Sequence, residues 1–236
     1  SQGLRFQPRP ESYFFCLWVS GYFVLFAKKP RKGLLQFYQK GFGFSTFKSL
    51  GYAIANFYQF GKIIIDRVAL RTPRKRIYTH SFDNEIVLRE MNASGKGGFL
   101  FSGHVGNWEN AGNLIGERIT SKINILMLDA EVEKIKSFIE SNVEGVKYNL
   151  IPLKDDMSHL ILIHQAFPAG PFIMAHKFKV PITFVFAIKT TSTHFSLSAT
   201  DPIVGGIDVH SPEEIAERYV KRLEALVKQV PKQWFN

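Results

Sequence analysis

The chain contains very little cysteine: Cys16 is the single cysteine among 236 residues. One cysteine excludes an internal disulfide and leaves no cluster of thiolates that could bind zinc. Structural disulfides are typical of oxidising compartments, so their exclusion is consistent with a reducing one.

The chain also lacks an apolar run long enough to cross a bilayer. Its longest, YFFCLWVSGYFVLFA from Tyr13 to Ala27, is shorter than the about 20 residues that a spanning helix needs, and no signal-peptide cleavage site follows it. Aromatic residues dominate this run, and the basic segment KKPRK, Lys28 to Lys32, comes directly after it. Aromatic side chains favour the membrane interface and basic clusters favour anionic headgroups. We therefore expect an interfacial or partly inserted helix, with a buried core helix as the alternative.

Acidic residues are few compared with basic ones, 20 against 30, which leaves a net charge of +10. Such an excess implies an anionic partner: nucleic acid, an acidic protein or an anionic membrane surface. No recognition helix, RNA-binding signature or phosphate-binding glycine loop with a lysine is present, which argues against nucleic acid and nucleotides. The hydrophobic share of 45% is typical of a globular chain.

The order of apolar patterns predicts an α/β fold with a central, largely parallel mixed sheet flanked by helices, preceded by an aromatic helical segment. Residues 44–70 form a helical pattern rich in aromatics, and from there strands and helices alternate. We predict strands at residues 77–82 (strand or loop), 97–103, 122–129, 149–153, 180–189 and 194–200, and helices at 84–95, 107–119, 131–142, 158–166, 171–179 and 211–230. The strand at 194–200 is predicted to pair after a turn at residues 190–193. The last helix has Ser211 as N-cap, Pro212 at its first position and Glu214 three residues after the cap.

One segment, FLFSGHVGNWENAG at residues 99–112, places a histidine between two glycines after a buried strand. In open α/β sheets, ligands bind beyond the carboxyl ends of strands, where loops lead into helices. There His104 can act as a general base, and Glu109 can orient its ring and stabilise the imidazolium. The backbone amides of Gly106 and Asn107 are candidate oxyanion donors that would bind substrate. The alternative is a structural histidine held by a nearby carboxylate, with plain turn chemistry around it.

The same spacing occurs a second time, in His80 and Glu85 of HSFDNE. This pair sits in a polar stretch without a preceding buried strand or a flanking glycine. We interpret it as the start of a helix, capped by Asp83 or Asn84. Spacing alone is therefore weak evidence for a catalytic pair.

Resemblance to known proteins adds to this evidence. GHVGNWE followed by an amphipathic helix resembles the His-x4-Asp/Glu motif of the glycerolipid acyltransferases, and more narrowly that of the lipid A biosynthesis lauroyl/myristoyl acyltransferase family. The run FPAGPFIMAHKFKVPITFVFAIK and the final PKQWFN also look like that family, so the resemblance covers roughly residues 44–236. It assigns the base to His104 and the orienting acid to Glu109.

The resemblance implies an acyltransferase that moves a fatty acyl chain from acyl carrier protein or coenzyme A to a hydroxyl of a lipid or glycolipid. Apart from that thioester co-substrate, it implies no cofactor and no metal. It also implies a peripheral or monotopic protein at the cytoplasmic face of the bacterial inner membrane. Residues 1–43 would then form a membrane-associated helical segment, and residues 44–236 the acyltransferase domain.

The chain departs from the family at one point. The family usually has a further strand and a loop bearing Asp and Arg between the SHLILIHQA and FPAGPF segments, whereas Ala166 here runs directly into Phe167. We therefore expect a break in the chain between about Gln165 and Pro168, seen as a Cα–Cα step longer than the usual 3.8 Å or so.

Two other functions remain open at this point. A hydrolase would use His104 to activate water on the same acyl thioester or ester, and would release free fatty acid without an acceptor. A non-catalytic basic lipid-binding module would contain His104 as a structural residue.

Overall fold

The computed structural model describes residues 10–70, 72–107, 123–128, 148–153 and 170–235. Its helices are α1 (Pro10–Phe26), α2 (Lys28–Phe42), α3 (Thr46–Ala69), α4 (Glu85–Ala93), α7 (Gly170–Phe178) and α8 (Pro212–Gln229), with 3-10 turns η1 (Pro73–Ile77) and η3 (Pro231–Gln233). Its strands are β1 (Thr79–Asp83), β2 (Phe99–Phe101), β3 (Ile123–Leu128), β4 (Tyr148–Leu153), β5 (Pro181–Lys189), β6 (His194–Ala199) and β7 (Ile203–Val204).

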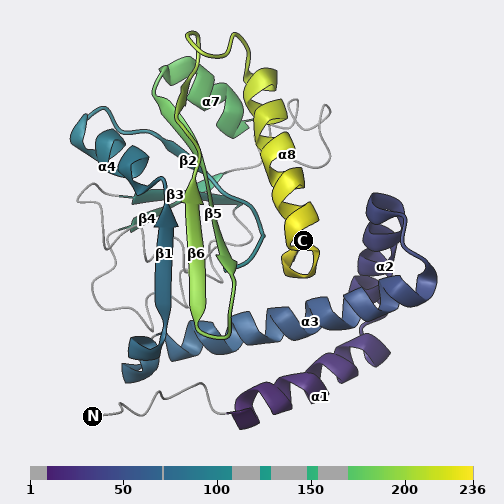
Figure 1. Cartoon of the computed structure of the whole chain (residues 1–236). Coiled ribbons are helices and arrows are strands. Elements are labelled where there is room, and N and C mark those ends of the chain that lie inside the picture. Colours follow the sequence, from purple (N-terminus) through teal and green to yellow (C-terminus); the bar gives the residue numbers. More distant parts are fainter. Residues whose placement is uncertain (1–9, 71, 108–122, 129–147, 154–169, 236) are drawn as a thin grey trace.

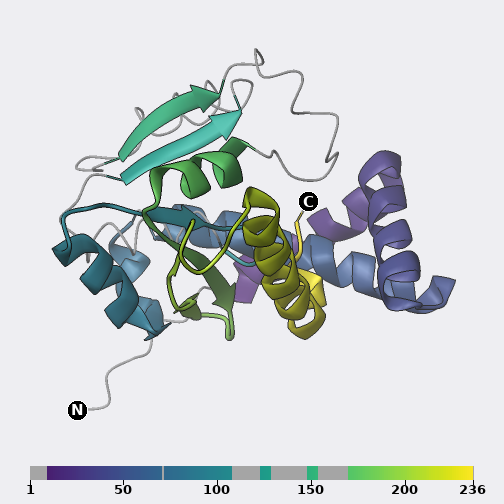
Figure 2. The ribbon, with the colours of Figure 1, turned by 90° about the horizontal axis from the view of Figure 1, so that it is seen from above.

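The larger sheet has the strand order β1-β6-β5-β2, with β7 also paired to β5. The β1–β6 and β2–β5 pairs are parallel, whereas β5 runs antiparallel to both β6 and β7. The parallel β3–β4 pair stands apart from this sheet (Figure 2). The α/β class with a mixed sheet is thus confirmed. The larger sheet is not largely parallel, because β5 and β6 form a hairpin across the turn predicted at residues 190–193.

Helices cover both faces of this sheet (Figure 1). On one face, buried side chains of β5 such as Phe184 and Phe186 pack with Phe172 of α7 and Tyr219 of α8. On the other face, Leu88 of α4 packs with Val185 of β5 and Ala199 of β6. Apolar residues occupy both faces of β5 because both faces are covered, and its near-continuous apolar sequence follows from that position.

Helix boundaries show which capping predictions were right. Ser211 caps α8 by accepting from the Glu214 amide at 3.3 Å, with Pro212 at the first turn, as the sequence predicts. At α4 the N-cap is Asn84, but its side chain makes no capping bond and donates to Asp201 Oδ1 at 2.9 Å. The N-cap predicted at Asp83 or Asn84 is therefore confirmed at Asn84, but no side-chain capping bond forms, because Asn84 has φ 60° and its side-chain amide is directed to another loop.

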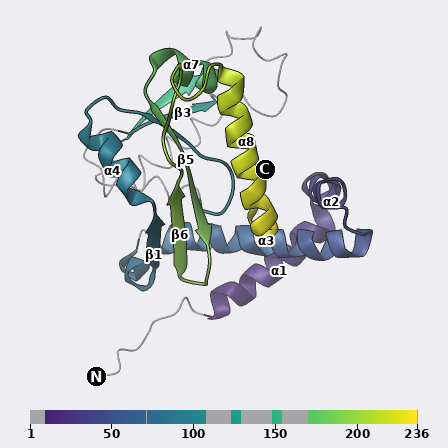
Figure 3. The same ribbon diagram turned by 45° about the horizontal axis from the view of Figure 1, so that its top comes forward.

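The N-terminal helices form a separate layer below the strands, in which α1 lies along α3 (Figures 1 and 3). Cys16 of α1 is buried against Gly61 of α3, and the rings of Phe23 and Phe57 stack at 6.0 Å. Gly43, with φ 66°, ends α2 and turns the chain into α3. The predicted boundary after residue 43 falls at this turn, and its status as a domain boundary stays a prediction.

Candidate functional site

His104 lies just after β2, on a loop that leaves the carboxyl end of that strand. Its side chain is exposed, while the next three residues, Val105 to Asn107, are buried. The loop returns to the sheet at once, because the Asn107 amide donates to the Ala187 carbonyl of β5 at 2.8 Å. The histidine is thus presented to solvent by a backbone that is fixed on both sides.

Tyr219 of α8 supports the loop from the core side. Its hydroxyl donates to the Ser102 carbonyl at 2.7 Å, and burial raises the pKa of Tyr219 to about 12, so the hydroxyl keeps its proton near neutral pH. A Cβ on Gly103 would lie 2.9 Å from this hydroxyl and 3.1 Å from Leu223 Cδ1. Glycine at position 103 therefore lets the loop pack closely against Tyr219 and Leu223 of α8.

The C-terminal tail, residues 230–235, holds the loop from the other side. The Gly106 amide donates to the Gln233 carbonyl at 2.9 Å, and the Phe235 amide donates to the His104 carbonyl at 2.9 Å. Val105 and Trp234 form an antiparallel bridge between these two bonds. The segment that carries His104 is consequently paired with residues that lie far away in the sequence.

The conformation of Gly106 explains the second glycine of the motif. Its φ of 65° is left-handed, and a Cβ there would overlap the Ala187 carbonyl. The amides of Gly106 and Asn107 donate to Gln233 and Ala187 respectively. We predicted these amides as oxyanion donors, and in this arrangement they cannot fill that role, because each N–H group is already donated within the protein.

The proposed partner of His104 lies outside the described residues. The described part of this segment ends at Asn107, so it does not include Trp108, Glu109 or the rest of the helix expected at residues 107–119. The expected break between Gln165 and Pro168 also lies outside the described residues. The orientation of the His104 ring by Glu109 therefore stays a prediction.

A buried ion pair that the sequence analysis missed lies under the same part of the sheet. Lys189, at the end of β5, contacts Asp66 of α3, and both side chains are almost wholly buried. The Tyr78 hydroxyl donates to Asp66 Oδ1 at 2.9 Å, and Lys189 Nζ lies 3.4 Å from the Tyr13 hydroxyl of α1. Its sequence signal was weak: Asp66 lies between Lys62 and Arg67 in KIIIDRV, and Lys189 ends the apolar run VPITFVFAIK.

Burial governs the protonation of this pair. Removal from water raises the pKa of the Asp66 carboxyl and lowers the pKa of the Lys189 ammonium, and the contact between them opposes both shifts. Burial likewise lowers the pKa of nearby Lys62. Each charged member thus depends on its partner to stay ionised. The pair joins the helical layer to the end of β5, two residues from Ala187.

The second histidine–acid pair is not brought together. His80 is exposed on β1, and Glu85 begins α4, where its carboxylate pairs with Arg89 at 3.0 Å. An extended strand rises about 3.3 Å per residue, which keeps positions five apart well separated. The interpretation of HSFDNE as a segment without catalytic geometry is consistent with these positions.

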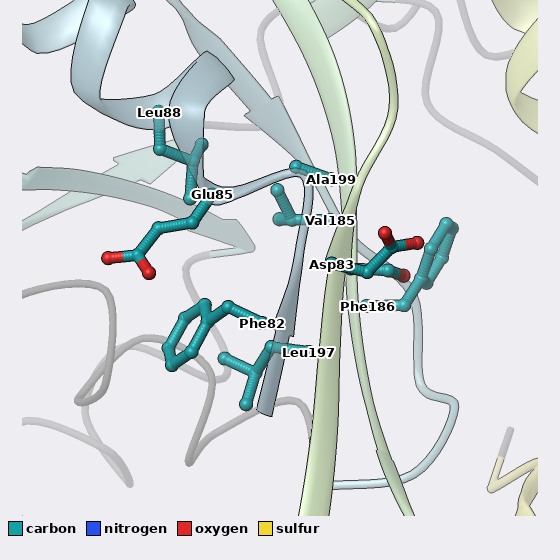
Figure 4. Close-up of a pocket in the computed structure, with 9 residues that line it drawn as sticks. Phe82, Asp83, Glu85, Leu88, Val185, Phe186, Leu197 and Ala199 are labelled. Atoms are coloured by element: carbon teal, nitrogen blue, oxygen red, sulfur yellow. The ribbon is translucent and has the colours of Figure 1, made fainter. Parts of the chain in front are cut away.

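A hollow lies at the opposite face of the sheet from α8, beside α4 (Figure 4). It is small and partly open to solvent, and its lining is mainly apolar. The close-up shows Phe82 and Leu197 together on one side of the strands and Asp83 and Phe186 on the other. The lining includes neither His104 nor Gly106 nor Asn107, so this hollow is separate from the histidine loop.

Helix α1 exposes an unusually large apolar surface. Trp18 is 69% exposed and Phe14 63%, and five further large apolar residues of the helix are also exposed: Leu17, Tyr22, Phe23, Leu25 and Phe26. The basic residues Lys28, Lys29 and Lys32 follow, also exposed. Across the part of the chain that the structure describes, no helix is both long and apolar enough to span a bilayer.

Comparison with known proteins adds no family assignment. The chain matches no family model, and it matches no curated protein. The function proposed below therefore rests on the residues, their geometry and the sequence resemblance given above.

Proposed function

We propose that this chain is an acyltransferase that moves a fatty acyl chain from an acyl thioester to a hydroxyl of a lipid or glycolipid, in a lipid A-type acylation. The observation that carries the proposal is the exposed His104 on a rigid, glycine-flanked loop beyond the carboxyl end of β2. The hydrogen bonds described above hold this loop through backbone atoms, which fixes the backbone position from which the ring extends.

The chemistry needs one base. The imidazole of His104 takes the proton of the acceptor hydroxyl while the oxygen attacks the thioester carbonyl carbon. The C–S bond of the tetrahedral intermediate then breaks, and the leaving thiolate takes the proton back from the imidazolium. Glu109 orients the ring and stabilises its cationic form. The thioester comes from acyl carrier protein or coenzyme A.

We place the protein at the cytoplasmic face of the bacterial inner membrane, as a peripheral or monotopic protein. The exposed aromatic surface of α1 and the basic residues after it support this location. A helix that is apolar all round is normally covered on every side, and α3 covers α1 on one side. An anionic membrane surface would cover the rest and match the net charge of +10.

The helical layer also connects this surface with the histidine loop. Phe60 of α3 is 43% exposed and its ring lies 5.4 Å from that of Phe235. Phe235 is in turn bonded to the His104 backbone. A lipid held at the N-terminal helices would therefore be close to the proposed base.

The test of catalysis is transfer of a labelled acyl chain from acyl carrier protein to a lipid acceptor. General-base removal typically costs 10²–10⁴-fold, so His104→Ala and Glu109→Ala should each lower kcat at least about 100-fold. Thermal melts should stay near those of the wild-type protein. A His104→Ala variant with near-normal rates would contradict the assignment of the base.

The same assay separates the competing activities. A hydrolase would release labelled free fatty acid at the same rate with and without the acceptor. A non-catalytic lipid-binding module would do neither, and would keep its lipid affinity in His104→Ala. Only the acyltransferase gives acylated acceptor that depends on His104.

Membrane binding through the exposed face of α1 is tested by flotation with vesicles that contain anionic lipid. Trp18→Glu places a charge in the exposed face of α1 and should move the protein toward the soluble fraction. Ile207→Glu is the matched control, because Ile207 is 70% exposed and lies in the loop before α8. Point variants are sharper than deletion of residues 1–43, which would also remove the bond of Tyr13 to the turn between β5 and β6 and the bond of Tyr38 to the tail. Equal flotation of both variants would contradict the proposed surface.

A further inference from the structure

The C-terminal tail, residues 230–235, is paired with the histidine loop as a short strand would be. Two backbone bonds, Gly106 to Gln233 and Phe235 to His104, flank the Val105–Trp234 bridge. These bonds fix the backbone at both ends of the tripeptide that begins with His104. The orientation of the histidine therefore depends on where the tail lies.

Gln233 fixes the tail to the sheet. Its side chain is buried, and it bonds to both backbone groups of Lys189: Oε1 accepts from the amide at 3.0 Å, and Nε2 donates to the carbonyl at 2.8 Å. A primary amide can form this pair of bonds because it carries a donor and an acceptor side by side. Through Gln233, the end of β5 and the histidine loop share one support.

The N-terminal helices fix the other residues of the tail. Asn56 of α3 donates to the carbonyls of Trp234 at 2.6 Å and of Lys232 at 3.3 Å. Tyr38 of α2 donates to the Pro231 carbonyl at 2.9 Å. The end of the chain thus lies against α3, where Figures 1 and 3 place it.

We infer that Gln233 is a positioning residue of the proposed active site, and that it acts through the tail on the backbone of His104. The inference rests on the proposed function for its catalytic consequence. A base must lie within hydrogen-bond reach of the hydroxyl it deprotonates, and a displacement of about 1 Å can cost on the order of 100-fold in rate. Release of the tail should therefore reduce kcat without removing any catalytic group.

The first test removes one hydrogen bond. Phe235→Pro and Phe235→Ala both remove the phenyl ring, but only the proline variant also removes the backbone N–H group that donates to the His104 carbonyl. Trp234 has ψ 119°, which suits a residue before proline. The readouts are the ring signal of His104 in NMR, assigned by its loss in His104→Gln, and hydrogen exchange of the Gly106 amide.

We expect the His104 signal to shift and Gly106 exchange to accelerate in Phe235→Pro, but much less in Phe235→Ala. In the acyl-transfer assay, kcat of Phe235→Pro should be at least about tenfold lower than kcat of Phe235→Ala, while KM for the thioester should differ less than about threefold.

The second test uses a pH-dependent rescue. Gln233→Glu keeps the size of the side chain, but its ionised form cannot donate to the Lys189 carbonyl. Because position 233 is buried, the pKa of the introduced carboxyl should be raised, so the carboxyl gains a proton and regains the donor as the pH falls toward 5. In Gln233→Glu, the NMR signal of His104 should therefore differ from the wild-type signal at pH 8. At pH 5 the two signals should be closer together. Gln229→Glu, on the exposed end of α8, is the matched control and should not shift it.

The outcomes separate this inference from the proposed function. If neither Phe235→Pro nor Gln233→Glu changes the His104 signal or Gly106 exchange, the positioning role is wrong. If both change while the wild-type protein transfers no acyl chain, the tail positions the loop and the acyltransferase proposal falls. If Phe235→Pro does not fold, the pH rescue of Gln233→Glu decides alone.

Discussion

Two segments of this chain contain a histidine five residues before a glutamate, and the protein treats them differently. His80 lies in the extended strand β1, and Glu85 begins the next helix, where it pairs with Arg89. His104 lies on a loop held by α8, β5 and the C-terminal tail. The first pair cannot meet, because a strand carries successive residues away from each other. The same spacing in a loop before a helix allows a meeting.

The comparison shows that a spacing motif has no fixed geometry of its own. What distinguishes the His104 segment is the number of distant elements that bond to its backbone. One of those elements, β5, is joined to α3 by the buried Asp66–Lys189 pair. Predictions about the two segments should therefore differ most where the support is altered.

The largest effect is expected at Lys189. Lys189→Met leaves the buried Asp66 without its cation, which typically costs about 3–5 kcal/mol of the free energy of unfolding. Lys228→Met is the control, because its pair with Glu224 is exposed and should contribute less than about 1 kcal/mol. Urea unfolding at pH 7 measures both. Equal losses in the two variants would show that the buried pair supports nothing.

The deficit of Lys189→Met should depend on pH. Burial raises the pKa of Asp66, and loss of Lys189 removes the charge that opposes this rise. A carboxyl with a raised folded-state pKa favours folding below its unfolded pKa of about 3.9, and that contribution is lost as the pH rises through the folded pKa. The deficit should thus be smallest near pH 4 and grow toward neutral pH. Urea unfolding midpoints across this pH range measure the deficit. A deficit that does not change with pH would contradict the expected role of Asp66.

A smaller effect is expected at two glycines that share a left-handed backbone. Gly106 has φ 65° and Gly95 has φ 66°, but a side chain would overlap the Ala187 carbonyl only at position 106. Gly95→Ala should cost about 1–2 kcal/mol through backbone strain alone. Gly106→Ala should cost about 2–4 kcal/mol, since overlap with the backbone adds to that strain. Equal melting temperatures for the two variants would mean that the loop can move away from β5.

The smallest effects are expected at the first pair. His80→Ala should leave the rate of acyl transfer within a few-fold of wild type, in contrast to His104→Ala. Glu85→Ala removes an exposed pair with Arg89 at helical spacing and should cost only about 0.3–0.5 kcal/mol. A large loss of activity in His80→Ala, with an unchanged melting temperature, would move the proposed site to β1.

Elements with strong local signals were predictable from the sequence. Helix α8 follows from Ser211, Pro212 and an apolar stripe at helical spacing, and all three appear in the structure. Strands β5 and β6 follow from apolar runs on either side of a polar turn. These signals are local, because capping and periodicity involve residues within a few positions of each other.

Other features were missed because their physical cause is a distant neighbour. The share of antiparallel pairing in the larger sheet was not predicted, since β5 pairs antiparallel with β7 as well as with β6. The amides of Gly106 and Asn107 looked available from the motif, yet residues 233 and 187 use them. Asp66 in a helix and Lys189 at the end of a strand gave no sign of each other across 123 positions.

The chain's own residue order thus settles where the helices and strands form and which segment presents a histidine between glycines. It does so because capping, side-chain periodicity and glycine conformation act over one or two turns of backbone. Tertiary packing settles which amides remain available, which histidine is held in place and which charges are buried together. Hydrogen bonds such as Gly106 to Gln233 join residues that only the folded chain brings within reach, so no local pattern can encode them.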